Sequence, residues 1–312
     1  MEQPVIIGGA SVDLKGRPFA KLKPRTSTIG RLERSFGGVG FNIAQNLAML
    51  GVIPHFITIV GNDPEGHSIL EECGRNGIAT KLIEINADEH TAIFEAILDE
   101  NGDLYGGISA MAIFDRITPE VLEPYEALLG KAPLVVTDCN IPQHTIEYIA
   151  DFCSARRVPL WVEPTSTDKA PKILSRIAQV TYLSPNKEEL ETLLDMPLFS
   201  YPEMTDGARR LIRKGLEHLF ITLGSDGVMW LAGEKALHRR SREVTTKDVT
   251  GAGDAFAAGV IWAILEGIPI DRAISYGMAA AIATLQVYKS VHPSLSSSLL
   301  ESIMKDFFPN EQ

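Results

Sequence analysis

Cysteine is scarce in this sequence, and its spacing excludes a disulfide framework or a structural zinc site. The three cysteines are Cys73, Cys139 and Cys153, an odd number, and no CxxC pair occurs. The N-terminus lacks the basic and apolar regions of a secretory signal. No run approaches the ~18 apolar residues of a membrane span. We therefore expect a reduced, cytoplasmic protein without a membrane segment.

Positive charge is also in short supply. The chain has 29 Lys and Arg against 40 Asp and Glu, a net charge of −11. Non-specific binding to nucleic acid or to an anionic membrane needs clustered positive charge, so neither partner is expected. The chain also lacks a GxxxxGK[ST] phosphate loop, a GxGxxG fingerprint, a GxSxG elbow and a metal-binding spacing of histidines. P-loop, Rossmann dinucleotide and serine hydrolase functions are therefore not supported.

Length and hydrophobic pattern favour one large α/β domain. The chain has 312 residues, of which 45% are hydrophobic, enough for a sizeable core. Short apolar runs alternate with helical patterns, which predicts a doubly wound, mostly parallel sheet with helices on both faces. Segments at about 11–36 and 91–108 break the alternation, and the second contains the turn dipeptide Asn101-Gly102. We expect these two segments to form a small separate sheet.

The stretch DVTGAGDAF, residues 248–256, places two acids around a glycine turn at the start of an apolar helix. The glycines can bring backbone amides close to a ligand, and the helix N-terminus favours an anion there. Asp254 falls in the first helical turn. An acid beside a phosphate site suits a base that removes a proton from an attacking hydroxyl. Alternatively, Asp248 or Asp254 caps the helix, and the stretch alone does not decide between the two.

Two further segments leave similar alternatives open. The glycine pair Gly37-Gly38 precedes a helix whose first turn contains Asn42. That asparagine either caps the helix or offers its amide to the hydroxyls of a polyol. In SPNKEELETLL, residues 184–194, Asn186 and Glu189 form a predicted capping box. Alternatively, these two residues lie near metal-bound phosphates.

Taken together, these segments resemble the ribokinase-like (PfkB) family of sugar and nucleoside kinases. The resemblance covers nearly the whole chain. It rests on GGVGFNIA, with Gly51 and Gly61 following at the expected intervals, and on DVTGAGDAFAAG at 248–259. It implies a single ribokinase-like domain over residues 1–312, with a β-sheet lid drawn from strands at about 11–36 and 91–108.

The resemblance also implies ATP-dependent phosphoryl transfer and a role for each site residue. Asp254 would be the general base. Amides of Gly251, Ala252 and Gly253 would form an anion hole, and Mg²⁺ would bridge the ATP phosphates near Asn186 and Glu189. Many members bind a monovalent cation such as K⁺ in the loop that begins with Asp248 and Thr250. The nucleotide site would comprise Asn186, Thr222, Gly224, Gly227, Gly251 and Gly253, and the sugar site Asp13, Gly37, Gly38 and Asn42.

Within the family, two stretches look most like pseudouridine kinases, which implies the 5′-hydroxyl of pseudouridine as acceptor. These are GGVGFNIAQNLAMLG and VVTDCNI, and the likeness adds Asp138, Asn140 and Lys169 to the substrate site. Phe41 departs from the pattern, because close relatives carry a basic or polar residue there. Ribose, adenosine, other nucleosides and other sugars remain alternative acceptors, and a non-catalytic nucleoside-binding protein is a further alternative. Lid sheets in this family often pair across a dimer, so a homodimer through the lid is expected.

Overall fold

The computed structural model describes residues 3–309, and its larger layer is a nine-stranded sheet. The strand order is β13-β12-β11-β10-β9-β8-β1-β4-β5; neighbours from β5 to β11 are parallel, and β12 and β13 are antiparallel. The bounds are β1 Val5–Ile7, β4 His55–Gly61, β5 Ile83–Asn86, β8 Val135–Asp138, β9 Leu160–Glu163, β10 Tyr182–Leu183, β11 His218–Thr222, β12 Val228–Ala232 and β13 Lys235–Arg239.

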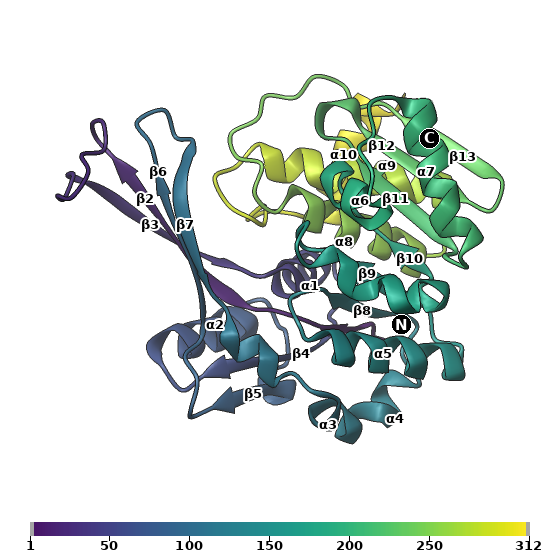
Figure 1. Ribbon diagram of the computed structural model, residues 1–312, viewed down its shortest axis with the longest axis horizontal. Coiled ribbons are helices and arrows are strands. Elements are labelled where there is room, and N and C mark those ends of the chain that lie inside the picture. Colours follow the sequence, from purple (N-terminus) through teal and green to yellow (C-terminus); the bar gives the residue numbers. More distant parts are fainter. Residues whose placement is uncertain (1–2, 310–312) are drawn as a thin grey trace.

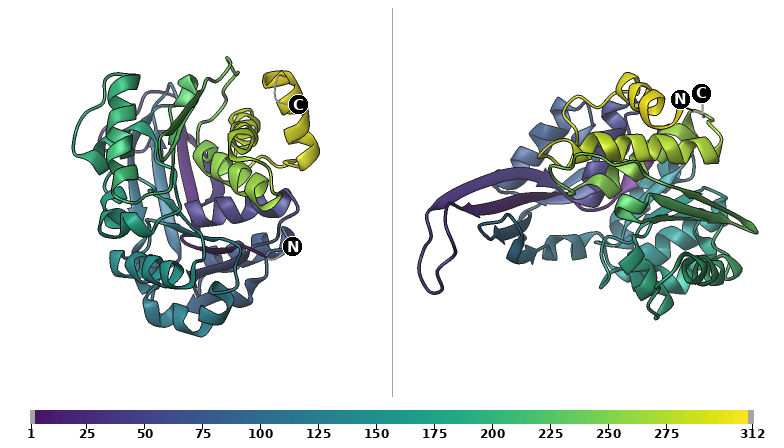
Figure 2. Two further views of the ribbon diagram at one scale, coloured as in Figure 1. Left: turned by 90° about the vertical axis from the view of Figure 1, so that its right-hand side faces the viewer. Right: turned by 90° about the horizontal axis from the view of Figure 1, so that it is seen from above.

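Helices cover both faces of this sheet, as Figures 1 and 2 show. The central strand β1 serves both cores, because Ile6 packs on one face while Val5 and Ile7 pack on the other. The first face carries α1 (Val39–Met49), α2 (Pro64–Arg75), α8 (Ala252–Leu265), α9 (Ile270–Leu285) and α10 (Ser297–Phe307). The second carries α3 (Pro119–Leu122), α4 (Glu126–Leu129), α5 (Gln143–Arg156), α6 (Lys187–Leu194), α7 (Tyr201–Arg213) and the 3₁₀ segment η4 (Ala170–Gln179).

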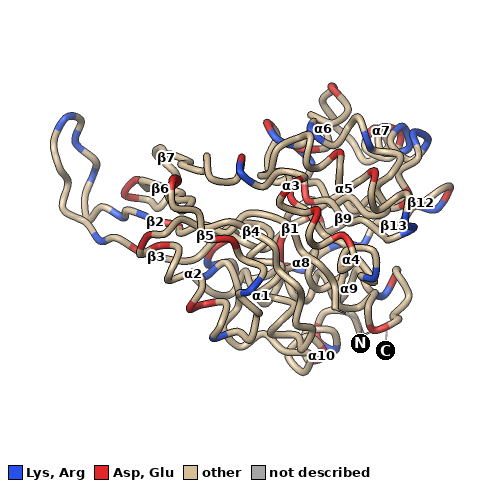
Figure 3. The backbone as a smooth tube through the Cα atoms, turned by 90° about the horizontal axis from the view of Figure 1, so that it is seen from below, with Lys and Arg blue, Asp and Glu red and all other residues tan. Residues whose placement is uncertain are grey.

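A four-stranded sheet, called the small sheet below, projects from this body at the left of Figure 1. Its order is β3-β2-β6-β7, with β2 parallel to β6 and the other pairs antiparallel. The bounds are β2 Ser11–Pro18, β3 Gly30–Gly37, β6 Ala92–Leu98 and β7 Leu104–Ala110. Figure 3 shows Lys and Arg along the β2–β3 hairpin, although the chain as a whole is acidic. The predicted fold class, a doubly wound sheet with a small separate sheet, is confirmed.

Some elements are short or irregular. Strand β10 has only two residues, and a 3₁₀ turn, η1 (Thr80–Leu82), directly precedes β5. Strand β13 was not expected, because its largely polar residues gain their strand geometry only by pairing with β12. Short 3₁₀ turns complete the chain: η2 (Ala112–Arg116), η3 (Glu123–Tyr125) and η5 (Gly224–Asp226). Among residues 3–309, no helix is long and apolar enough to cross a membrane.

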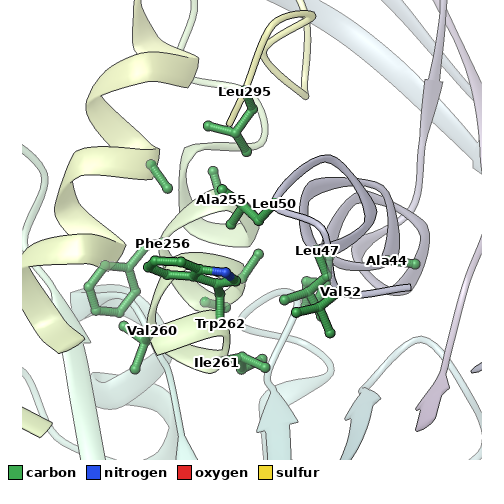
Figure 4. Close-up of a cluster of buried hydrophobic side chains, with 14 of the residues drawn as sticks. Ala44, Leu47, Leu50, Val52, Ala255, Phe256, Val260, Ile261, Trp262 and Leu295 are labelled. Carbon is green, nitrogen blue, oxygen red and sulfur yellow. The ribbon is translucent and has the colours of Figure 1, made fainter. Parts of the chain in front are cut away.

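The packing of α1 against α8 brings together the two helices whose first turns carry Asn42 and Asp254. Figure 4 shows Ala44 and Leu47 of α1 beside apolar side chains of α8, among them Ile261. Helix α8 is buried on nearly all sides, which accounts for its almost uniformly apolar sequence. The chain segments that the sequence analysis singled out at 37–42 and 248–256 therefore meet in space.

Candidate active site

The candidate residues lie at the carboxyl ends of the parallel strands, where open α/β sheets bind their ligands. Asp138 is the last residue of β8, and Glu163 is the last residue of β9. Asn186 follows β10 as the N-cap of α6, and Thr222 ends β11. A parallel bridge joins Asn186 to Thr222, so the loops after β10 and β11 are held side by side.

Asp254 and Asn42 contact each other directly. The Nδ2 group of Asn42 donates a hydrogen bond to Oδ2 of Asp254 over 2.7 Å. Helix α8 begins after Gly251 and α1 after Gly38, and within the described residues neither helix has a side-chain cap. Neither Asp254 nor Asn42 is therefore a helix cap, which was the alternative that the sequence left open for each.

The surroundings of Asp254 weaken its acidity. Burial raises the pKa of this half-buried carboxyl to about 7, although the hydrogen bond from Asn42 acts in the opposite direction. The carboxylates of Asp138, Asp13 and Glu189 raise the pKa further through like-charge repulsion. Four acids predicted from separate parts of the sequence thus converge on one site. A carboxyl with a pKa near neutrality is well suited to accept and release a proton.

The turn before α8 is shaped by its glycines. Gly251 has φ +80°, and a Cβ there would lie 2.1 Å from the carbonyl oxygen of Ser290. Only glycine fits this position. At Gly253, by contrast, a Cβ would meet no atom within 4 Å, so the turn presents an open face. The first backbone amides of a helix have no partner inside it, and together with the helix dipole they form a site for an anion.

Asp13 faces the same region from the small sheet. Its carboxylate is buried and accepts a hydrogen bond from Oγ of Ser11 over 3.1 Å. Burial raises its pKa. Gly37 lies against it so closely that a Cβ would approach Oδ2 of Asp13 to 2.3 Å, and Gly38 has φ +95°. The small sheet and the start of α1 therefore form one continuous polar wall that includes Asp13, Gly37 and Asn42.

Asp138 joins two loops to the first turn of α1. Its Oδ2 accepts hydrogen bonds from the amides of Gly9 and Gly40, both over 2.9 Å, and its Oδ1 accepts one from the amide of Asn140 over 2.9 Å. The side chain is almost fully buried. Because both oxygens have main-chain partners, we infer that Asp138 positions the loops around the site rather than contacting a ligand itself.

Asn140 and Lys169 form a polar pair just beyond the end of β8. The ammonium of Lys169 donates to Oδ1 of Asn140 over 2.6 Å, and both side chains are half-buried. Lys172 supports the same loop by donating to the carbonyl oxygens of Cys139 and Ile141, each over 2.9 Å. The two residues predicted at the substrate site are thus brought together on a braced loop.

The predicted capping box of α6 is confirmed. Oδ1 of Asn186 accepts a hydrogen bond from the amide of Glu189 over 2.8 Å, and Oε2 of Glu189 accepts one from the amide of Asn186 over 2.9 Å. Burial raises the pKa of Glu189. Gly224 and Gly227 flank the turn after β11 with φ of +57° and +91°. These glycines follow Thr222, which the parallel bridge holds beside Asn186.

Two residues of the site were missed by sequence reasoning. The ammonium of Lys15 lies 3.2 Å from Oδ2 of Asp248 and 3.1 Å from Oγ1 of Thr250. The signal was strand alternation, because Lys15 follows Asp13 by two positions and shares its face of β2. Glu163 is buried and accepts a hydrogen bond from Nε1 of Trp161 over 2.5 Å. Burial, with the nearby charge of Asp254, raises its pKa well above the ordinary value.

Phe41 lies outside this site. Its ring is fully buried and packs against Phe36 and Phe56. Phe41 therefore fills the core beneath α1 and places no aromatic ring against the candidate ligand residues.

The chain is similar to known kinases over nearly its whole length. Residues 1–296 match the pfkB family carbohydrate kinases. The chain is 32% identical to a pseudouridine kinase of Escherichia coli (strain K12) over 306 residues, which cover 97% of this chain and 96% of that protein. It is 26% identical to a guanosine-inosine kinase of Exiguobacterium acetylicum over 305 residues, covering 97% and 100%. The fold matches that of an Arabidopsis thaliana ribokinase solved with ribose and ATP, with a TM-score of 0.87, 23% identity and coverage of 97% and 99%.

Proposed function

Because the chain belongs to the pfkB family of carbohydrate kinases, we propose that it transfers the γ-phosphoryl group of ATP to the 5′-hydroxyl of a ribosyl substrate, with pseudouridine as the preferred acceptor. The observation that carries the proposal is the position of Asp254 in the first turn of α8. There a carboxyl with a pKa of about 7 lies beside an anion site.

Asp254 acts as the general base in this proposal. Its ionised carboxylate takes the proton of the attacking hydroxyl as that oxygen bonds to phosphorus, and the bond between phosphorus and the ADP oxygen breaks. Asn42 fixes Oδ2 of Asp254 by its 2.7 Å hydrogen bond. Because Oδ2 accepts this bond, Oδ1 of Asp254 is the oxygen that would receive the proton.

The amides of Gly251 and Gly253 would stabilise the transferring phosphoryl group, whereas the predicted third donor, the amide of Ala252, donates to the carbonyl oxygen of Val249 over 3.3 Å. The two glycine amides are preorganised by the turn, so they need no rearrangement as charge develops on the phosphoryl oxygens. The open face at Gly253 leaves room for the phosphate oxygens. Thr222, Gly224 and Gly227 line the path along which the rest of the nucleotide would lie, next to Asn186.

Magnesium fits this site as an ion held mainly by phosphate and water. Within residues 3–309 no group of three or more Asp, Glu, His or Cys side chains is placed to hold a metal. Mg²⁺ commonly keeps several waters and binds through one or two carboxylates together with substrate phosphates. Glu189 would supply such a carboxylate, and Asn186 lies next to it in the capping box. The bound ion would offset the charge of the phosphates. Holding Glu189 in the capping box keeps that carboxylate in place.

The acceptor ribose would lie between the small sheet and α1. Oδ1 of Asn42 is buried and has no hydrogen-bond partner among the described residues. A buried acceptor without a donor is costly, and a ribose hydroxyl would satisfy it. Asp13 would accept from a neighbouring hydroxyl, beside the closely approaching backbone of Gly37.

Lys169 and Asn140 would read the base. An ammonium and a carboxamide donate to carbonyl oxygens, and a uracil ring carries two of these. Pseudouridine and uridine differ in which ring atom is joined to the ribose, so the orientation of the polar edge differs between them. A fixed Lys169–Asn140 pair can therefore distinguish the two nucleosides.

A second copy of this chain would cover the outer face of the small sheet. Leu32, Ile97 and Ile108 are exposed on the face opposite to Asp13, as the register of β3, β2, β6 and β7 dictates. Strand β7 is an edge strand without a charged residue, LYGGISA. Unprotected apolar edges of this kind are normally paired or covered. We therefore propose a homodimer through this face.

An acceptor panel tests the function directly. ADP formation is measured with Mg·ATP and pseudouridine, uridine, inosine, guanosine, adenosine, ribose or 2-keto-3-deoxygluconate, and the product is identified by mass and ³¹P spectra. We expect kcat/KM for pseudouridine to exceed that for uridine by at least about tenfold, or ~1.4 kcal/mol. 5′-Deoxypseudouridine should bind without being phosphorylated. Lys169→Met should reduce the preference for pseudouridine while leaving the KM for ATP unchanged.

The other outcomes identify the alternatives. Faster turnover of ribose, of a purine nucleoside or of another sugar would replace pseudouridine by that acceptor and retain the kinase. A nucleoside that raises the melting temperature without any ADP formation would instead indicate a non-catalytic nucleoside-binding protein.

A further inference from the structure

An ion pair joins the small sheet to residues 248–250, which precede the anion site and are called the phosphate loop below. The Lys15 ammonium donates to Oδ2 of Asp248 over 3.2 Å and to Oγ1 of Thr250 over 3.1 Å. The side chains of Lys15 and Asp248 are only 17% and 16% exposed. A pair so shielded from solvent is much less weakened by salt than a surface pair. The contact links residues 233 positions apart in the chain.

The carboxylate directly opposite Lys15 on the small sheet is already engaged. Lys15 lies opposite Glu33 in the β2–β3 register. The carboxylate of Glu33, however, is already paired with Arg17 at 3.1 Å and with Arg31 at 2.9 Å. The ammonium of Lys15 extends instead across the gap to Asp248.

Asp248 organises the turn into α8. Its Oδ1 accepts hydrogen bonds from the amide of Thr250 over 2.9 Å and from Oγ1 of Thr250 over 2.7 Å, while Oδ2 receives Lys15. The next residue, Gly251, is held against the carbonyl oxygen of Ser290. The position of the Asp248 carboxylate therefore sets the position of the Gly251 and Gly253 amides.

A free monovalent cation does not fit between Asp248 and Thr250. The Lys15 ammonium already lies within hydrogen-bond distance of both side-chain oxygens that would coordinate it. A second positive charge at this distance would be repelled. The expectation of a K⁺ site at Asp248 and Thr250 is thus at variance with the structure.

We propose that Lys15 is the built-in cation of this loop: its ammonium replaces a bound monovalent ion and fixes the turn that carries the anion-binding amides. Lys15 is a positioning residue, since it acts on the phosphoryl group through Asp248 and Thr250. The inference rests on the proposed phosphoryl transfer for its kinetic consequence. The contact of Lys15 with Asp248 also connects the small sheet to the phosphate loop. The polar wall around Asp13 and the anion site are therefore held in a fixed relation to each other.

The test compares Lys15→Met with the wild-type enzyme in tetramethylammonium chloride, KCl and NH₄Cl at equal ionic strength. For the wild type we expect kcat and melting temperature to be the same in all three salts. For Lys15→Met in tetramethylammonium chloride we expect kcat to fall by about tenfold to 100-fold, the scale of a small misplacement of catalytic groups. K⁺ or NH₄⁺ should restore part of kcat and raise the melting temperature of this variant. A cavity of about 710 Å³ that borders both Lys15 and Asp248 gives these ions access.

Lys21→Met is the control. Lys21 is exposed in the segment that joins β2 to β3, so its replacement removes the same charge and leaves both arginine partners of Glu33 in place. Its activity and melting temperature should not depend on the monovalent cation. Wild-type activity that rises severalfold with K⁺, or a Lys15→Met enzyme with normal kcat in tetramethylammonium chloride, would overturn the inference. The melting-temperature comparison needs no turnover, so it tests the cation role even if the proposed acceptor proves wrong.

Discussion

The amide nitrogen of Asn42 lies 2.7 Å from a carboxylate oxygen of Asp254, and this contact joins the first turns of α1 and α8. It links the part of the site that would hold the acceptor to the part that would hold the phosphoryl group. The oxygen of the same side-chain amide, Oδ1 of Asn42, is buried without a partner among the described residues. Asn42 is therefore placed to orient both the base and the substrate.

Asp254→Asn should abolish most of the turnover while leaving both substrates bound. The variant keeps the size of the side chain and an oxygen that can accept the bond from Asn42, but it cannot take up the proton. Removing a positioned base typically lowers the rate by ~10²–10⁴-fold. Steady-state kinetics give kcat, and calorimetric titration with the acceptor and a non-hydrolysable ATP analogue gives the affinities. A kcat within a few-fold of the wild-type value would reject Asp254 as the base.

The rate should depend on pH through the same carboxyl. Asp254 accepts a proton only when ionised, and its pKa is raised to about 7. We expect kcat/KM to rise about tenfold per pH unit below pH 7 and to level off above it, since kcat/KM reports the free enzyme. A profile that stayed flat down to pH 5.5 would contradict this assignment. The residual activity of Asp254→Asn should lack the inflection.

Asp254 should also lower the stability of the fold at alkaline pH. Its pKa is about 7 in the folded state and ~3.9 in the unfolded chain, so the folded state binds more protons between these values. The free energy of unfolding therefore falls as pH rises through this window, and the full penalty is present above pH 7. We expect Asp254→Asn to raise the melting temperature more at pH 8 than at pH 4. An equal effect at both values would show that charge is not the cause.

Substitutions of Glu189 separate its two roles. Glutamine keeps an oxygen that can accept the hydrogen bond from the Asn186 amide, so Glu189→Gln should retain the capping box and the melting temperature. Losing the charge should raise the Mg²⁺ concentration needed for half-maximal activity roughly tenfold, or ~1.4 kcal/mol. Glu189→Ala removes the box as well and should lower stability by about 1 kcal/mol. An unchanged Mg²⁺ requirement in Glu189→Gln would confine this residue to capping.

The outer face of the small sheet can be tested by charge insertion. Ile108→Lys and Leu32→Lys each place an ammonium in the proposed dimer interface. Light scattering after size-exclusion chromatography should show a dimer for the wild type and a monomer for both variants. Phe199→Lys is the control, since Phe199 is an exposed apolar residue of the body outside the small sheet. A monomeric wild-type protein at micromolar concentration would rule out the dimer.

Features set by residues close in sequence were predictable. The capping box involves residues three positions apart, and the helix after the glycine turn begins at Ala252 as expected. The alternation of apolar runs with helical patterns likewise predicted the doubly wound sheet, and the segments that break it predicted the small sheet. In each case the physical cause is local, namely backbone hydrogen bonding and side-chain direction along one element.

Contacts across the chain could not be predicted in the same way. Asn42 and Asp254 are 212 positions apart, and they meet because apolar residues of α1 and α8 pack together. The partner of Lys15 depends on Glu33 being already occupied by two arginines. The role of Asp138 depends on amides from two loops and from the first turn of α1. These arrangements arise from tertiary packing, which a single sequence does not display.

The bond between Trp161 and Glu163 gives the protein an internal optical reporter. Trp161, one of three tryptophans, is fully buried and stacks on Tyr182 and Phe220. Its indole nitrogen donates to the carboxyl of Glu163, whose pKa is raised in part by the charge of Asp254. Indole emission shifts with the electric field along the ring. Binding of a phosphate-bearing ligand and its counterions changes that field a short distance away. The intrinsic fluorescence of Trp161 can therefore follow ligand arrival at the strand ends in real time, without a label and without turnover.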